Sequence, residues 1–162
     1  MISQIGVGTA IGQTARFGGG PRLVTVIAVE DSLVLQATDQ ALTLIAQDAP
    51  QIWQVVAGLL YLQLRGMVQM LAEATALAPR ERLAARLMRL APNAPGSADL
   101  HISQQALGEM VGLSRKSVNL YLAEFERLGL VKRNYASISI RNRSELRRAI
   151  GPGAISSRDF AD

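Results

Sequence analysis

Apolar residues recur at helical spacing in several stretches of the chain, and one stretch carries the clearest pattern. Between Ile102 and Val131, the sequence ISQQALGEMVGLSRKSVNLYLAEFERLGLV predicts two short helices joined by a tight turn. Ser103 and Ser114 each suit a helix start, because a serine hydroxyl accepts a hydrogen bond from an otherwise unpaired backbone N–H. Gly112 stands at the turn, where a residue that tolerates positive φ is favoured. The stretch therefore predicts a helix-turn-helix unit.

The second helix of this unit has one apolar face. Val118, Leu122 and Phe125 recur at i, i+4 and i+7, so they predict the side that packs on the core. Gly108 is small where the two helices are expected to cross. Gly129 follows the second helix and suits its end.

The most apolar stretch of the chain is a long helix predicted to start near Pro50 and to end near Ala76. Its apolar positions are too many for one face and fall in two stripes, one with Ile52, Val56, Leu59, Met67 and Met70, the other with Val55, Leu60, Leu64 and Leu71. Two apolar stripes must be covered on two sides. We expect one side to pack on the preceding segment and the other on a second copy of the helix, as in a coiled coil. The alternative is a helix buried within a single domain.

The other elements are shorter. Leu23–Val29 and Leu33–Leu35 predict a β-hairpin, because both runs are apolar and a turn sequence separates them. Helices are expected over 39–47, from Pro79 to about residue 90, and over 144–150. His101 is expected on a short strand before the helix-turn-helix unit. Strands over 131–134 and 137–141 would pair as a wing behind it.

These elements predict an α+β chain in four parts. Residues 1–49 hold a β segment, residues 50–77 the long dimerisation helix, residues 78–150 a winged helix-turn-helix domain, and residues 151–162 a flexible tail.

Composition narrows the function. The chain has no cysteine, which excludes disulfides, thiolate metal ligands and cysteine-held iron–sulfur clusters. His101 is the single histidine, so a histidine metal site within one chain is not expected. No nucleophile–base constellation and no P-loop is found, so we do not expect an enzyme. The sequence shows neither a signal peptide pattern nor a charge-free stretch of membrane-spanning length, which favours a cytoplasmic protein.

Charge is unevenly distributed. Residues 1–78 hold three basic and five acidic side chains, whereas residues 100–150 hold nine basic and four acidic ones. A basic domain attached to a mildly acidic one is typical of a phosphate-binding module joined to a sensor or scaffold. A merely soluble basic surface is the alternative.

The polar face of the second helix carries the candidate chemistry. Arg115, Lys116 and Asn119 lie opposite the apolar face and near the N-terminus of the helix. In a helix-turn-helix protein this end enters the major groove, where Arg and Lys donate to guanine and Asn pairs with adenine. Leu120 lies on the same side and suits contact with a thymine methyl. The alternative is a solvated charged face.

A β segment, a long dimerising helix and a C-terminal winged helix-turn-helix, in that order, resemble the cyclic-AMP receptor protein/Fnr (Crp/Fnr) family of bacterial transcription regulators. The helix-turn-helix stretch carries the closest resemblance, and the preceding PRERLAARLMRLA also matches. The likeness covers about residues 10 to 150. It implies a homodimer through the 50–77 helix that regulates transcription by binding a near-palindromic site on double-stranded DNA. RNA polymerase would be a further partner.

In this family a β-roll holds a cassette that binds a cyclic nucleotide. Gly12-Gln13, followed by Gly18-Gly19-Gly20-Pro21-Arg22 and then Leu23, resembles that cassette, with Gln13 in place of the family's glutamate. The resemblance implies that Gly12, Gln13, Arg22 and Leu23 form an effector site for a nucleotide like cyclic AMP. Arg22 would hold the cyclic phosphate. The roll begins well ahead of the cassette in the family, so an incomplete N-terminal β-roll is expected here.

The same resemblance places base reading on Arg115, Lys116, Asn119 and Leu120. Phosphate contacts would fall near the helix N-termini and on the wing, at Ser103, Gln104, Ser114, Ser117 and Arg133. A protein-interaction module without DNA binding is the alternative function, because some winged helices serve protein contacts only.

Overall fold

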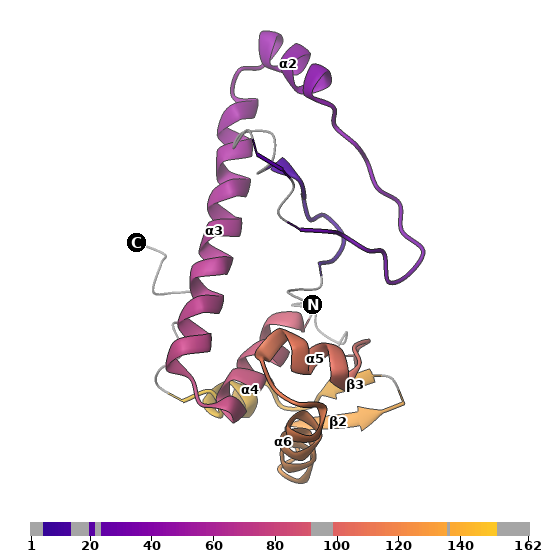
Figure 1. Cartoon of the computed structure of the whole chain (residues 1–162), viewed down its shortest axis with the longest axis vertical. Helices are drawn as coiled ribbons and strands as arrows, with labels where there is room; N and C mark the ends of the chain where they lie inside the picture. Colours follow the sequence, from indigo (N-terminus) through magenta and orange to yellow (C-terminus); the bar gives the residue numbers. More distant parts are fainter. Residues whose placement is uncertain (1–4, 14–19, 22–23, 92–98, 136, 152–162) are drawn as a thin grey trace. The chain divides into compact units, whose positions relative to one another are not determined.

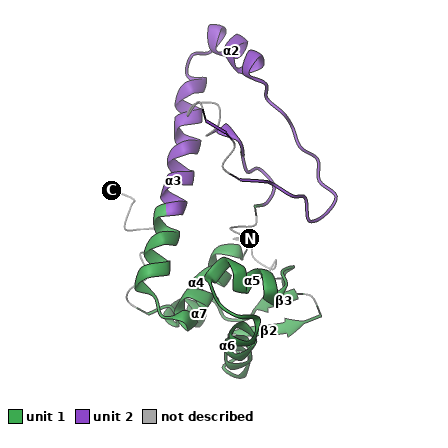
Figure 2. Ribbon diagram, viewed as in Figure 1, with its two compact units in different colours: residues 1–5, 68–162 green, residues 6–67 purple. Residues whose placement is uncertain are grey.

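The computed structural model describes residues 5–13, 20–21, 24–91, 99–135 and 137–151. The chain divides into two compact units, one of residues 1–5 and 68–162 and one of residues 6–67 (Figure 2). Helix α3 (Ile52–Ala76) belongs to both, since its last turns, from Val68 on, fall in the larger unit.

The larger unit is a winged helix-turn-helix domain (Figure 1). After α3, its elements are α4 (Pro79–Leu90), β1 (Asp99–Leu100), α5 (Gln104–Val111), α6 (Arg115–Arg127), β2 (Val131–Asn134), β3 (Ser137–Ile140) and α7 (Arg143–Arg148). The three strands form an antiparallel sheet in the order β1-β3-β2. Leu100 pairs with Ile138, and Val131 pairs with Ile140. The predicted wing and last helix are confirmed, with shifts of one or two residues at their ends.

The core of this unit is formed where the helices meet. Its fully buried side chains come from four helices and include Leu83, Leu87, Leu107, Val118, Leu122, Phe125 and Leu146. Burying one such side chain stabilises a fold by about 1.5–3 kcal/mol. The apolar face predicted for the second helix of the motif is therefore confirmed.

The turn of the helix-turn-helix is built as its sequence predicts. The hydroxyls of Ser103 and Ser114 accept from the backbone N–H groups of Ala106 and Ser117, at 3.1 and 3.0 Å. Gly112 ends α5 with φ at 66°, in the left-handed region that glycine adopts without strain. Gly108 faces the backbone of the turn: an added Cβ would lie 2.5 Å from the carbonyl oxygen of Leu113. The small residue at the crossing is thus required by the turn itself.

Helix α3 spans Ile52–Ala76 and confirms the predicted long helix. Among the described helices, it is the one long and apolar enough to cross a membrane, judged by length and composition alone. Several of its large apolar side chains are exposed in the single chain, among them Val55, Leu62, Leu64, Met67 and Leu71.

The smaller unit corrects one expectation. No strand forms over residues 24–38, where the hairpin was expected, and Leu33 and Leu35 are 93% and 90% exposed. Two short runs cannot pair stably unless other strands or a helix cover their apolar faces, and the described part of this unit contributes no such strand. Helix α2 (Asp39–Asp48) follows, with the Thr38 hydroxyl accepting from the N–H of Ala41 at 3.2 Å.

Two smaller expectations are also settled. His101 was expected on a strand, but β1 ends at Leu100, so this position was wrong by one residue. The predicted tail beyond Gly151 lies outside the described residues.

Candidate nucleic-acid interface

Helix α6 presents two faces of opposite character. Val118, Leu122 and Phe125 are completely buried. On the other side, the four predicted base-reading residues are all exposed: Arg115, Lys116, Asn119 and Leu120. Leu120 is a large apolar side chain left 65% exposed. The fold therefore presents hydrogen-bond donors, an amide and an apolar contact together at the N-terminal half of one helix, which is what major-groove reading requires.

The wing is joined to this helix by Arg133 of β2. Its Nη1 donates to Asn119 Oδ1 at 2.9 Å, and its Nε donates to Glu126 Oε2 at 2.7 Å. The backbone N–H of Arg133 also donates to Glu126 Oε1, at 2.8 Å. These hydrogen bonds lower the pKa of Glu126. The bond from the backbone N–H has the larger effect, and the bond from the guanidinium has the second largest. Arg133, predicted as a DNA contact, is thus also the residue that holds Asn119 in place.

Glu126 was not identified from the sequence. It lies seven residues after Asn119, which places both on the same side of α6. This spacing could have indicated an acidic partner for the basic wing.

The predicted phosphate contacts lie at the two helix starts. The hydroxyls of Ser103 and Ser114 are engaged as caps, and the hydroxyls of Ser114 and Ser117 lie 2.9 Å apart. Gln104 begins α5 and is half-buried. These residues hold the helix ends in shape, and their contact with phosphate stays a prediction.

The wing adds further exposed groups. Lys132 and Arg141 are exposed, and the Tyr135 side chain is fully exposed where β2 leads toward β3. The wing therefore presents basic side chains and an aromatic ring to solvent.

The predicted effector site is described only in part. Gly12 is exposed with φ at 93°, and the Gln13 side-chain oxygen and nitrogen are buried with no hydrogen-bond partner within the described ranges. Arg22 and Leu23 lie outside the described residues. Binding of a cyclic nucleotide by these four residues stays a prediction.

Residues 81–149 match the family model of the Crp-like helix-turn-helix domain. No curated protein matches the chain.

Solved structures with the same fold include FixK2 from Bradyrhizobium japonicum, at 18% identity and a TM-score of 0.61, covering 68% of this chain and 57% of that one. TTHB099, a transcriptional regulator of the CRP family from Thermus thermophilus, is 22% identical with a TM-score of 0.54, covering 63% of this chain and 55% of that one. A CooA mutant from Carboxydothermus hydrogenoformans is 17% identical with a TM-score of 0.57, covering 67% of this chain and 53% of that one. The chain matches little more than half the length of these three proteins.

The matched segment contains most of α4, the whole helix-turn-helix, the wing and α7, and so includes α5, α6 and the wing, on which the interface above is built. Residues 81–149 form a Crp-like helix-turn-helix domain, and the chain shares its fold with the solved structures named above.

Proposed function

We propose that this protein is a sequence-specific DNA-binding transcription regulator that acts as a homodimer on a near-palindromic site. The observation that carries the proposal is the division of α6 into a completely buried apolar face and an exposed face with Arg115, Lys116 and Asn119. Helix α6 would lie in the major groove, and the basic wing would contact the flanking phosphates. Contact with RNA polymerase belongs to the same proposal.

The exposed apolar side chains of α3 support the homodimer. Leu64, Val68 and Leu71 lie at i, i+4 and i+7 on one face of α3 and are 61%, 46% and 66% exposed in the single chain. An exposed apolar stripe of this length along one helix is typical of a surface that another helix covers. Two copies joined in this way would present two α6 helices to successive major grooves.

Selection from a randomised duplex pool tests the function. The purified chain is incubated with the pool at two salt concentrations, and the bound sequences are determined. We expect a near-palindromic consensus, and we expect affinity for it to fall steeply with salt, because each neutralised phosphate releases counterions.

Variants separate base reading from charge. Arg115→Ala or Asn119→Ala should lower affinity for the consensus while much of the binding to random DNA remains. Arg148→Ala is the matched control, because it removes a positive charge from α7, outside the helix-turn-helix. Equal losses on consensus and random DNA would refute base reading. No enrichment from the pool would favour the protein-interaction module.

A further inference from the structure

The larger unit contains a cavity of about 220 Å³. No residue of α6 lines it, so it is separate from the interface described above. Its lining comes from the last turns of α3, from α4 and from the end of α5, and includes Met70, Glu73, Arg82, Arg86, Met110 and Gly112. The lining is thus mixed, with thioether and aliphatic groups beside two guanidinium groups.

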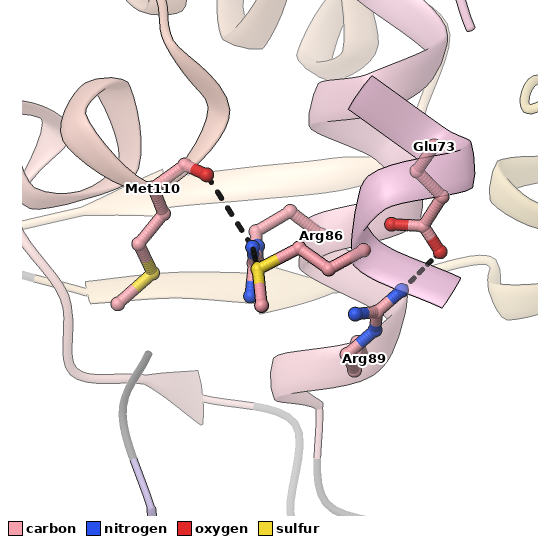
Figure 3. Close-up of polar contacts among 5 residues, drawn as sticks. Glu73, Arg86, Arg89 and Met110 are labelled. Carbon is pink, nitrogen blue, oxygen red and sulfur yellow. Dashed lines mark hydrogen bonds and ion pairs between the residues drawn. The ribbon is translucent and has the colours of Figure 1, made fainter. Parts of the chain in front are cut away.

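Arg86 is buried in this lining without a carboxylate partner. Only 3% of the residue is exposed. Its Nη2 donates to the backbone oxygen of Met110 at 3.3 Å (Figure 3). The same nitrogen lies 3.1 Å from the sulfur of Met70. Both are weak partners for a guanidinium, and both are reached by Nη2. The hydrogen bonds described for Arg86 all come from Nη2, and among the described residues none is given for its Nε or Nη1.

The nearby charges do not compensate Arg86. Glu73, the one carboxylate of the lining, is paired with Arg89 (Figure 3). Burial, and next the charge of Arg89, lower the pKa of Arg86, while Glu73 offsets part of this effect. A buried guanidinium with unmet donors is costly, and an anion in the cavity would reduce that cost.

Arg82 adds a second unmet donor. Its Nη1 donates to the backbone oxygen of Ala74 at 3.0 Å, which anchors the guanidinium to the end of α3. Its Nε is buried and has no hydrogen-bond partner among the residues that the structure describes. Two arginines in one small cavity, each with donors to spare, match the several acceptor oxygens of a phosphate or carboxylate group.

We propose that this cavity binds a small oxyanion, a phosphate or carboxylate group, through Arg86 and Arg82. The inference rests on the geometry of the larger unit and is independent of the proposed DNA binding, so its test contains no DNA.

The test is titration of the full chain with inorganic phosphate, pyrophosphate and citrate at constant ionic strength, followed by calorimetry and by ¹H–¹⁵N shifts. We expect saturable binding of at least one anion, with the largest shifts at the amides of Ala74, Val111 and Gly112. Chloride at the same ionic strength should give neither saturable binding nor these amide shifts. Comparison of citrate with the two phosphates identifies the preferred oxyanion.

Variants assign the binding to the arginines. Arg86→Met keeps a long side chain without its charge and should lower the affinity for the anion at least tenfold. Arg148→Met, on an exposed arginine of α7, is the matched control and should leave affinity unchanged. If Arg86→Met does not fold, the affinity of Arg82→Gln and the wild-type shift map decide whether the anion binds in this cavity. The proposal is overturned if none of the three anions binds saturably, if the shifts fall on α6 and the wing instead, or if removal of either arginine leaves affinity unchanged.

Discussion

Asn119 of α6 and Arg133 of the wing are joined by a hydrogen bond of 2.9 Å, from the arginine Nη1 to the asparagine Oδ1. Glu126 holds the same arginine through both its backbone N–H and its Nε. Since Arg133 occupies the amide oxygen, the amide nitrogen of Asn119 is the group that remains free to donate to a base acceptor. The wing therefore sets the orientation of a side chain on the exposed face of α6.

The first prediction is that Arg133 affects which base Asn119 selects. Arg133→Met should relax discrimination at one base pair of each half-site by about tenfold, because an amide that is no longer held can rotate to offer either its oxygen or its nitrogen. Competition binding between the consensus and a duplex altered at that base pair measures the effect.

Arg133→Lys separates orientation from charge. Lysine keeps the positive charge but lacks the fork that reaches Asn119 and Glu126 together. If Arg133 acts through phosphate alone, the methionine variant should lose affinity equally on all duplexes, and lysine should restore that affinity. Arg141→Met, which removes an exposed charge of the wing region, serves as the control.

The second prediction concerns the pH dependence of stability. Because the pKa of Glu126 is lowered in the fold, its stabilising contribution is complete above its unfolded pKa of about 4.3 and is lost as the pH falls through the folded value. Denaturant unfolding measured from pH 7 to pH 3 should therefore show a steeper loss of stability for the wild type than for Glu126→Gln. Arg133→Met should flatten the curve in the same way. Parallel curves for all three proteins would contradict the pairing.

The helix-turn-helix could be predicted closely because its sequence signals are local. A cap, a glycine turn and an apolar face each act within a few residues, and Ser103, Gly112 and Phe125 all take the positions expected of them. The strands expected near Leu23–Leu35 depend instead on partners distant in the sequence. Their β-branched residues suit a sheet, but pattern alone supplies no neighbouring strand for them.

The site could be predicted only as a set of exposed residues. Helical spacing placed Arg115, Lys116 and Asn119 on one face, but the hydrogen bond between Asn119 and Arg133 crosses fourteen positions and depends on how the wing folds back on α6. The cavity around Arg86 escaped prediction for the same reason. An arginine on an amphipathic helix is expected to point to solvent, whereas packing of α3 and α5 against α4 buries Arg86.

The third prediction concerns the turn. Gly108→Ala should destabilise the domain by about 1–3 kcal/mol, because the new methyl would meet the carbonyl oxygen of Leu113 at 2.5 Å and the turn must shift. The free energy of unfolding from denaturant titration measures this loss. DNA affinity should fall with it, since the turn sets the angle of α6.

Gly112 provides the comparison. An added Cβ there meets nothing within 4 Å, so the cost of Gly112→Ala comes from its φ of 66° alone. We expect about 1 kcal/mol for alanine and less for asparagine, which tolerates the left-handed region better. A loss at Gly108 no larger than at Gly112 would mean that the turn relaxes freely.

The fourth prediction concerns the homodimer. Leu64 and Leu71 lie seven residues apart on α3, on one stripe, and both are exposed in the single chain. Leu64→Glu combined with Leu71→Glu should convert the protein to a monomer, because charges placed on a helix–helix seam lose their hydration. Affinity for the palindromic site should then fall at least a hundredfold, since linking two half-site contacts strengthens binding by that order.

Sedimentation equilibrium over a range of loading concentrations measures the mass of each protein. Leu33→Glu is the control, because it places the same charge on another exposed leucine, in the segment before α2. A dimer that survives the double substitution, or a wild type that stays monomeric at every concentration, would exclude this seam.

Because α3 is also long and apolar enough to cross a membrane, flotation of the wild type with lipid vesicles is measured in parallel. Recovery of the protein with the vesicles would assign the apolar surface of α3 to lipid, whereas a dimer left in the lipid-free fraction assigns it to a second copy of the chain.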